Sequence, residues 1–165
     1  MGQAYLSLGS NIAPEANLRS AIHALHERFG EVRLSPVYRT PAVGFDGADF
    51  LNAAALIESD LDAHALNDWL HALEDLHGRD RSGARFSDRP LDIDIVFYDD
   101  LVLDGAGHLQ IPRDELRHAF VLKPLADIAP DYVHPQIGVP LATLWARSGL
   151  TIGPIVALAS TSAET

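Results

Sequence analysis

Residues 91–97 run Leu-Asp-Ile-Asp-Ile-Val-Phe, an alternation of apolar and acidic side chains that is typical of a β-strand. Because successive side chains of a strand point to opposite faces, the apolar residues share one face, and Asp92 and Asp94 share the other. The two carboxylates are then about 6.5–7 Å apart at the backbone. Neighbouring like charges destabilise a strand unless something neutralises them. The alternation therefore predicts a half-buried strand with a cation on its acidic face.

An arginine-rich loop precedes this strand. It carries four of the twelve basic residues of a chain whose net charge is −11: Arg79, Arg81, Arg85 and Arg89. The guanidinium fork matches phosphate oxygens, and Mg²⁺ prefers carboxylate and phosphate oxygens as ligands. Gly and Ser in the loop give it the freedom to close over a substrate. The segment therefore predicts a site for a polyphosphate and its metal ions.

Other interpretations of the two aspartates and of the arginine-rich loop remain open from the sequence alone. The two aspartates could lie on a solvated strand face, and the arginines could pair within the loop with Asp80 and Asp88. A nucleic-acid patch is disfavoured, because a pI near 4.9 gives the wrong long-range field for a phosphate backbone.

Other kinds of site have weaker support. The eight histidines include His23 and His26 at helical spacing, but no third zinc ligand is near them in the sequence. The chain has no cysteine, no G-x-S-x-G, no G-x-G-x-x-G and no P-loop. A nucleotide site must therefore depend on arginines and metal ions.

The chain has 165 residues, of which 47% are hydrophobic and 21% charged, as expected for one globular domain. We expect this domain over residues 1–159 and a flexible tail over 160–165. The absence of cysteine fits a reducing compartment, and no signal peptide or membrane-spanning run is evident. We therefore expect a cytoplasmic protein without nucleic-acid or membrane partners.

The pattern of apolar residues predicts an α+β fold. Strands are expected at 4–8, 32–39, 50–58 and 91–98, and helices at 15–29 and 62–77. The apolar stripe of the second helix consists of Leu66, Trp69, Leu70, Leu73 and Leu76. The order strand, helix, strand, strand, helix, strand is the ferredoxin-like βαββαβ arrangement. The proline-rich C-terminal third gives no clear elements and is expected to be an irregular extension.

Several short motifs occur in order from Ala4 to about Pro135. They are Tyr5-Leu-Ser-Leu-Gly-Ser-Asn11, Tyr38-Arg-Thr-Pro41, Phe50-Leu-Asn-Ala-Ala54, Glu74 with Gly78-Arg79, Arg89-x-x-Asp92-Ile-Asp94, Phe120-Val-Leu-x-Pro-Leu125 and Ile128-Ala-Pro130. Each is weak alone, but together they are specific. With these motifs the chain resembles the 6-hydroxymethyl-7,8-dihydropterin pyrophosphokinase family of folate biosynthesis.

The resemblance implies a diphosphotransferase that moves pyrophosphate from ATP to the hydroxymethyl group of the pterin and releases AMP. Asp92 and Asp94 match the ligands of two Mg²⁺ ions, and Arg79 and Arg89 match the arginines that assist transfer. The implied ATP-binding residues are His71, Glu74, Arg81, Arg85, Ile95 and, as a hypothesis, Arg113. The implied pterin-binding residues are Thr40, Pro41, Val43, Phe50, Asn52 and Phe120. The implied substrates are small molecules, and we also expect a monomer.

Three departures from the family pattern concern the ATP side. Ser87-Asp88 precede Arg89 where the family usually has small residues or proline, Arg113 follows Pro112 where histidine is common, and the segment before Phe120 is one residue short. Asp88 is expected to add a negative charge beside the phosphates. These changes leave open a divergent paralogue that binds pterin or nucleotide with altered substrate or little turnover. A two-metal nuclease or a sugar-nucleotide transferase with a DxD motif is a more distant alternative.

Overall fold

The computed structural model describes residues 1–78, 88–105 and 109–158 of the chain. In chain order, its elements are β1 Gly2–Ser10, α1 Pro14–Phe29, β2 Val32–Leu34, β3 Val37–Thr40, β4 Phe50–Ser59, α2 Ala63–Leu76, β5 Asp92–Tyr98, β6 Leu103–Asp104, β7 Gln110–Ile111, the 3₁₀ helix η2 Asp114–Arg117, α3 Ala119–Ile128, α4 Leu141–Ser148 and β8 Ile155–Val156. The predicted strands and helices of the first 98 residues are confirmed, with the 32–39 segment divided into β2 and β3.

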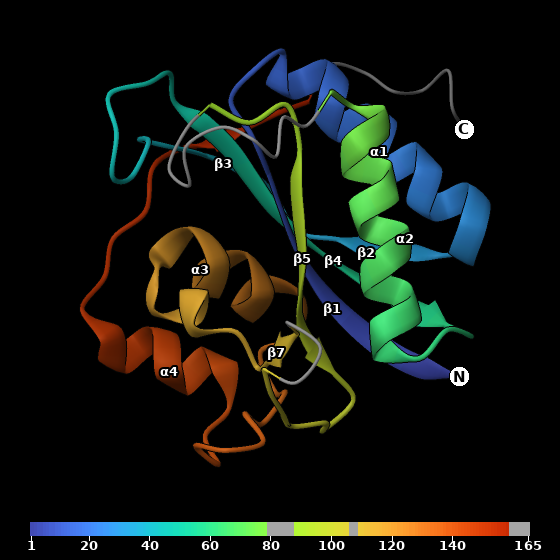
Figure 1. The fold of residues 1–165 in the computed structure, drawn as a ribbon. Coiled ribbons are helices and arrows are strands. Elements are labelled where there is room, and N and C mark those ends of the chain that lie inside the picture. The colour runs from blue at the N-terminus through green and yellow to red at the C-terminus, as the bar shows by residue number, and fades with distance from the viewer. Residues whose placement is uncertain (79–87, 106–108, 159–165) are drawn as a thin grey trace.

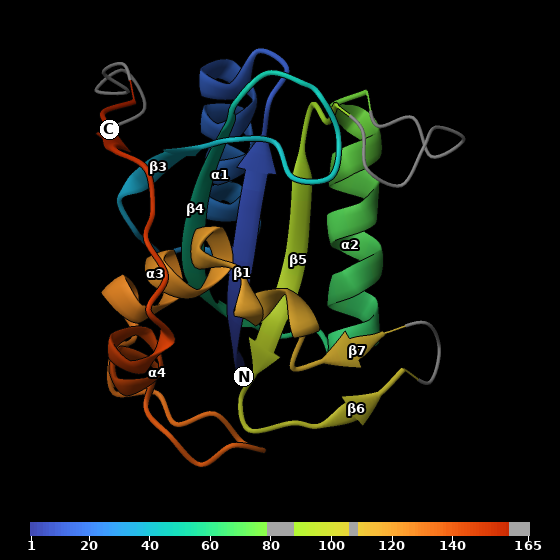
Figure 2. The same ribbon diagram turned by 90° about the vertical axis from the view of Figure 1, so that its left-hand side faces the viewer.

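The strands pair in an antiparallel sheet of order β5-β1-β4-β3-β8, and β2 also pairs with β4. Helices α1 and α2 cover one face of this sheet, and α3 and α4 lie against the other (Figures 1 and 2). The order β1, α1, β2 and β3, β4, α2, β5 confirms the ferredoxin-like prediction. Strands β6 and β7 form a separate small hairpin.

The core under α1 and α2 contains the apolar face of the alternating strand. Ile93 and Ile95 are buried there against helix residues such as Leu66 and Leu70. Helix α2 begins where the Asp62 carboxylate accepts a hydrogen bond from the Ala65 N–H at 2.8 Å, which satisfies a donor of the first turn. The prediction that Leu76 belongs to the buried apolar stripe is wrong, because this residue at the end of the helix is 83% exposed.

A second core lies on the opposite face of the sheet and belongs to the C-terminal third. Tyr5 and Phe97 pack there with apolar residues of α3 and α4, including Leu125 and Leu141. The ring of Tyr132 lies 4.5 Å from that of Tyr5 and 4.6 Å from that of Phe97, centroid to centroid. The extension is therefore more regular than expected, and β8 even joins the sheet beside β3.

The division between β2 and β3 is caused by Pro36, which has no N–H to donate to a ladder. Its neighbour Ser35 replaces the regular pairing. The Ser35 N–H donates to the Ala54 carbonyl at 2.9 Å, and the Ser35 hydroxyl accepts from the Ala54 N–H at 2.8 Å. The side chain thus keeps β4 satisfied across the break.

Strand β5 contains a β-bulge. Leu6 pairs with Ile95 and Tyr5 pairs with Phe97, so Val96 is an extra residue on β5. Val96 and Phe97 consequently both pack in the α3 core, whereas Tyr98 returns to the core under α1 and α2. One strand therefore contributes large side chains to both cores.

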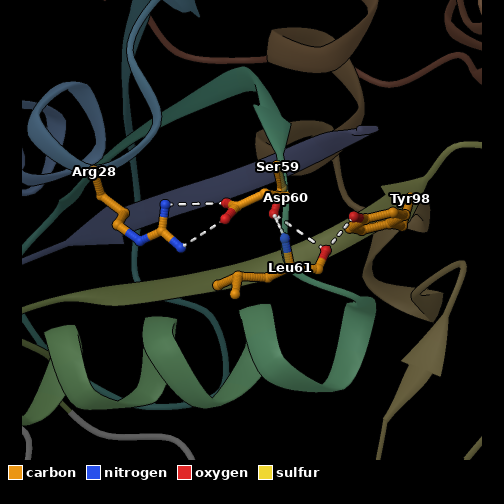
Figure 3. Close-up of polar contacts among 5 residues, drawn as sticks. All are labelled: Arg28, Ser59, Asp60, Leu61 and Tyr98. Atoms are coloured by element: carbon orange, nitrogen blue, oxygen red, sulfur yellow. Dashed lines mark hydrogen bonds and ion pairs between the residues drawn. The ribbon is translucent and has the colours of Figure 1, made fainter.

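The connection from β4 to α2 is fixed by polar contacts (Figure 3). The Ser59 hydroxyl accepts from the Leu61 N–H at 3.0 Å, Tyr98 donates to the Leu61 carbonyl, and Arg28 pairs with Asp60 at 3.0 Å. This corner is distant from the acidic strand end, since Ser59 pairs with the first residue of β1 and Asp92 pairs near its last. Among the described helices, none is long and apolar enough to cross a membrane.

Candidate active site

A pocket of about 880 Å³ opens on the sheet face opposite α1 and α2, near the end of β1. Figure 2 shows the segment between β3 and β4 crossing this end of the sheet. The pocket brings together these residues singled out from the sequence: Thr40, Pro41, Val43, Phe50, Asn52, Arg89, Asp92, Asp94, Arg113 and Phe120. Its volume is in the range typical of sites for small organic ligands.

The register of the sheet explains why these residues meet. Gly9 on β1 pairs with Asn52 on β4 and with Asp92 on β5. These three positions therefore form a row across the pocket face. A Cβ at Gly9 would stand 2.7 Å from the Asn52 side-chain oxygen, so the row needs glycine at its centre.

One side of the pocket is lined by Asp92 and Asp94, and the buried Glu74 lies beside them to form a cluster of acids. Carboxylate oxygens of Glu74, Asp92 and Asp94 all lie within 4.8 Å of one another. Glu74 is buried and accepts from the Ile93 N–H at 2.9 Å, which satisfies a backbone donor on the edge strand β5. Three hard oxygen donors at this spacing suit Mg²⁺, so the residues fit the metal that the family resemblance implies.

The cluster of Glu74, Asp92 and Asp94 contains only acids, so it has no positive charge of its own. Burial and the nearby charge of Asp92 raise the pKa of Asp94 to about 8, although Arg113 opposes the shift. This increase means that placing all three negative charges side by side is unfavourable. A divalent cation would relieve that repulsion.

Arg113 approaches the cluster from the segment before η2. Its guanidinium lies 3.7 Å from an Asp94 oxygen and 2.6 Å from a Glu115 oxygen. Burial opposes the charged form of Arg113, but the two acids keep its pKa above the ordinary value. Burial likewise opposes ionisation of Glu115, but the bond from Arg113 lowers the pKa of Glu115 below its usual range.

The other side of the pocket combines an amide with aromatic rings. Asn52 and Thr40 are buried, and the Asn52 amide donates to the Thr40 hydroxyl. Phe50 meets Phe45 edge to face at 6.3 Å, and Phe120 stacks on His118 at 4.9 Å with ring planes 13° apart. An amide between flat rings can bind a planar heterocycle that carries hydrogen-bonding groups on its edge.

Asn11, which follows β1, connects the loop before β5 to the loop before β4. Its amide donates to the Asp88 carboxylate at 2.8 Å and to the Ala48 carbonyl at 3.1 Å, and its oxygen accepts from the Arg89 N–H at 2.7 Å. Asp88 is thus hydrogen-bonded to Asn11, and it is not among the residues that line the pocket. Its carboxylate connects the loop before β5 to Asn11, and the Asn11 amide extends the connection to the loop before β4.

Other residues singled out from the sequence lie elsewhere. Glu74 belongs to the acid cluster, Ile95 has its side chain in the core under α1 and α2, and His71 lies on the exposed side of α2. Arg79, Arg81 and Arg85 lie outside the described residues. Asn11 and Glu115 are not recognisable as site residues from the sequence, because neither has a signal beyond its place in a short motif or beside Arg113.

The chain is similar in sequence to known proteins. The sequence profile of the family described as 7,8-dihydro-6-hydroxymethylpterin-pyrophosphokinase (HPPK) matches residues 5–130. A relative from Methylorubrum extorquens is 41% identical over 138 residues, which cover 81% of this chain and 86% of the relative. A relative from Synechocystis sp. is 39% identical over 145 residues, covering 86% of this chain and 73% of the relative. Both are called 2-amino-4-hydroxy-6-hydroxymethyldihydropteridine pyrophosphokinase.

Solved structures show the same fold. The Plasmodium falciparum HPPK-DHPS structure with pteroate superposes with a TM-score of 0.70 at 13% sequence identity, over 88% of this chain and 44% of that one. The chain therefore spans less than half of that larger protein. The fold and the comparisons together define an enzyme of the diphosphotransferase class. The chain belongs to the 7,8-dihydro-6-hydroxymethylpterin pyrophosphokinase family.

Proposed function

We propose that this enzyme transfers the β,γ-pyrophosphoryl group of ATP to the hydroxymethyl oxygen of 6-hydroxymethyl-7,8-dihydropterin. The hydroxyl oxygen attacks the β-phosphorus, the bond from that phosphorus to the oxygen bridging the α-phosphate breaks, and AMP leaves. The hydroxyl proton is released. The products are AMP and the pterin diphosphate, an intermediate of folate biosynthesis.

One observation carries the proposal. A single pocket joins a cluster of carboxylates, suited to a metal-bound triphosphate, to a buried amide between aromatic rings, suited to a pterin. Pyrophosphoryl transfer needs its two substrates side by side and in line, and it needs charge neutralisation more than a strong base. Among the described residues of the site no general base is evident, which is consistent with this chemistry.

The residues divide between the two substrates. Asn52 and Thr40 would bind the polar edge of the pterin, Phe50 and Phe120 would cover its faces, and Pro41 and Val43 would form the rim. On the ATP side, the arginines would bind phosphate oxygens: Arg79, Arg81, Arg85, Arg89 and Arg113. His71 and Glu74 would lie near the adenosine, and Ile95 would act through its backbone on the edge strand.

Metal ions complete this proposal. Two Mg²⁺ ions held by Asp92 and Asp94 would neutralise the triphosphate and polarise the phosphorus that is attacked. Glu74 would remain hydrogen-bonded to the β5 backbone and add its negative charge to the site. Arg79 and Arg89 would stabilise the charge that develops during transfer.

The product distinguishes this function from its rivals. Purified enzyme, ATP, Mg²⁺ and reduced hydroxymethylpterin should yield AMP and pterin diphosphate in equal amounts, measured by ion-exchange chromatography. ADP as the nucleotide product would indicate an ordinary kinase. Binding of both substrates without AMP formation would instead select the paralogue that binds without turnover. Omitting the metal should abolish AMP formation.

The wider context is also part of the proposal. We propose one catalytic domain over residues 1–159; the tail expected over 160–165 lies outside the described residues. We further propose a monomer that acts in the cytoplasm on small molecules, without nucleic-acid or membrane partners. Light scattering and cell fractionation would test the oligomeric state and the compartment.

A further inference from the structure

Arg113 makes two unequal contacts with acids. One guanidinium nitrogen lies 2.6 Å from the Glu115 carboxylate, and the other lies 3.7 Å from that of Asp94. The first is a strong charge-assisted hydrogen bond, and the second is an ion pair without hydrogen-bond contact. The Arg113 and Asp94 side chains are each only 26% exposed, so their charges interact with limited screening by solvent.

The local chain explains this position. Arg113 caps the start of η2 and Glu115 lies within its first turn, so the acid holds the guanidinium from the same short element. The Arg113 Nε is buried without a hydrogen-bond partner among the described residues. An unsatisfied buried donor is costly, so this pose does not use the full hydrogen-bonding capacity of the arginine.

A metal ion and Arg113 would compete for the carboxylate of Asp94. Both are cations, and both would lie beside the same carboxylate, so each repels the other. A metal-bound triphosphate changes this balance, because its oxygens offer Arg113 another anionic partner in the same pocket. Arg113 therefore disfavours the metal alone and favours the metal together with nucleotide.

We infer that Arg113, held in place by Glu115, competes with the divalent cation for Asp94 and thereby makes metal binding depend on nucleotide. This inference rests on the proposed function, since it assumes that the acid cluster takes a metal and a triphosphate. It assigns to Glu115 a positioning role. It also gives Arg113 an effect beyond phosphate binding, since this residue sets the affinity for the metal alone.

Mn²⁺ binding without nucleotide tests the inference directly, with free Mn²⁺ measured by electron paramagnetic resonance. Arg113→Met should bind Mn²⁺ about tenfold more tightly than wild type, because a neighbouring positive charge is removed. Glu115→Gln should bind Mn²⁺ about threefold more weakly, because the guanidinium loses its partner and turns fully to Asp94. Circular dichroism and thermal melting confirm that each variant is folded.

The affinity of Arg113→Met for a triphosphate should change in the opposite direction to its affinity for Mn²⁺ alone. Binding of α,β-methylene-ATP with Mn²⁺, measured by calorimetry, should be about tenfold weaker in Arg113→Met. The matched control is Arg28→Met, which removes the same charge from the Arg28–Asp60 pair at the far end of the sheet (Figure 3). Its affinities for Mn²⁺ and for the analogue should equal those of wild type.

The outcomes distinguish a failure of the proposed metal site from a failure of the proposed competition between Arg113 and the metal. If wild-type protein takes up no Mn²⁺ with or without the analogue, the metal part of the proposed function is wrong. If wild type binds Mn²⁺ but Arg113→Met binds it equally or more weakly, the competition is refuted. Should Arg113→Met fail to fold, Glu115→Gln decides alone, and unchanged or tighter Mn²⁺ binding there overturns the inference.

Discussion

Replacing Asp94 by Asn should change how the stability of the enzyme depends on pH. Asp94 is the acid whose pKa rises from 3.8 to about 8, through burial and the nearby charge of Asp92. Between these values the folded protein binds the proton more tightly than the unfolded chain does. The free energy of unfolding of metal-free wild type should therefore fall as the pH rises from about 4 to 8. Asn, which does not ionise, should remove this decline.

The size of the effect follows from the shift. About four pKa units at about 1.4 kcal/mol each set an upper limit of about 6 kcal/mol. Because the Asp94 side chain is 26% exposed, solvent screens part of this penalty. We therefore expect Asp94→Asn to be more stable than wild type by about 2–3 kcal/mol at pH 8, with little difference near pH 4, where the carboxyl is largely protonated in the folded protein and begins to ionise in the unfolded chain.

Urea unfolding of metal-free protein, from pH 4 to 9, measures this difference. Adding Mg²⁺ at pH 8 should stabilise wild type far more than Asp94→Asn, because a ligand of the folded state stabilises it by mass action. The same variant should lose AMP formation while keeping its fold. Parallel stability curves for the two proteins across the pH range would refute the proposed repulsion among the acids.

Other predictions concern the pocket walls and the core. Gly9→Ala should raise the KM for pterin about tenfold and leave the KM for ATP nearly unchanged, because its Cβ would displace the Asn52 oxygen 2.7 Å away; equal effects on both substrates would contradict this. Asp88→Ala should lower kcat several-fold by losing the 2.8 Å bond from Asn11, whereas Asp88→Asn keeps an acceptor and most of the rate; steady-state kinetics showing equal rates would count against this role. Leu70→Ala should cost about 3 kcal/mol in urea unfolding with unchanged KM values, since Leu70 is fully buried far from the pocket face.

Much of the fold could be predicted from local signals. Period-two alternation marks β5, and helical spacing with the cap at Asp62 marks α2. The C-terminal elements are less visible. Helix α3 contains Pro124, and α4 has only eight residues and no side-chain cap. Their stability comes from packing on the sheet, which a local pattern does not reveal.

The candidate site was predictable where one strand carries it. Alternation alone correctly placed Asp92 and Asp94 on the face opposite Ile93, and the pocket lies on that face. The approach of Glu74 to these acids depends on how α2 packs against β5, which the sequence does not state. The bonds from Asn11 to Asp88 and Ala48 cross 77 and 37 residues of sequence, and such long-range pairs leave no local pattern.

The extra residue in β5 constrains how this enzyme can diverge. Val96 shifts the alternation by one position, so Phe97 fills one core and Tyr98 the other. Losing a single residue here would exchange the environments of these two rings and leave both layers badly filled. Apolar substitutions at Val96 and at its neighbours in the two cores should therefore be tolerated over evolutionary time, whereas a change in the length of this part of the strand should not.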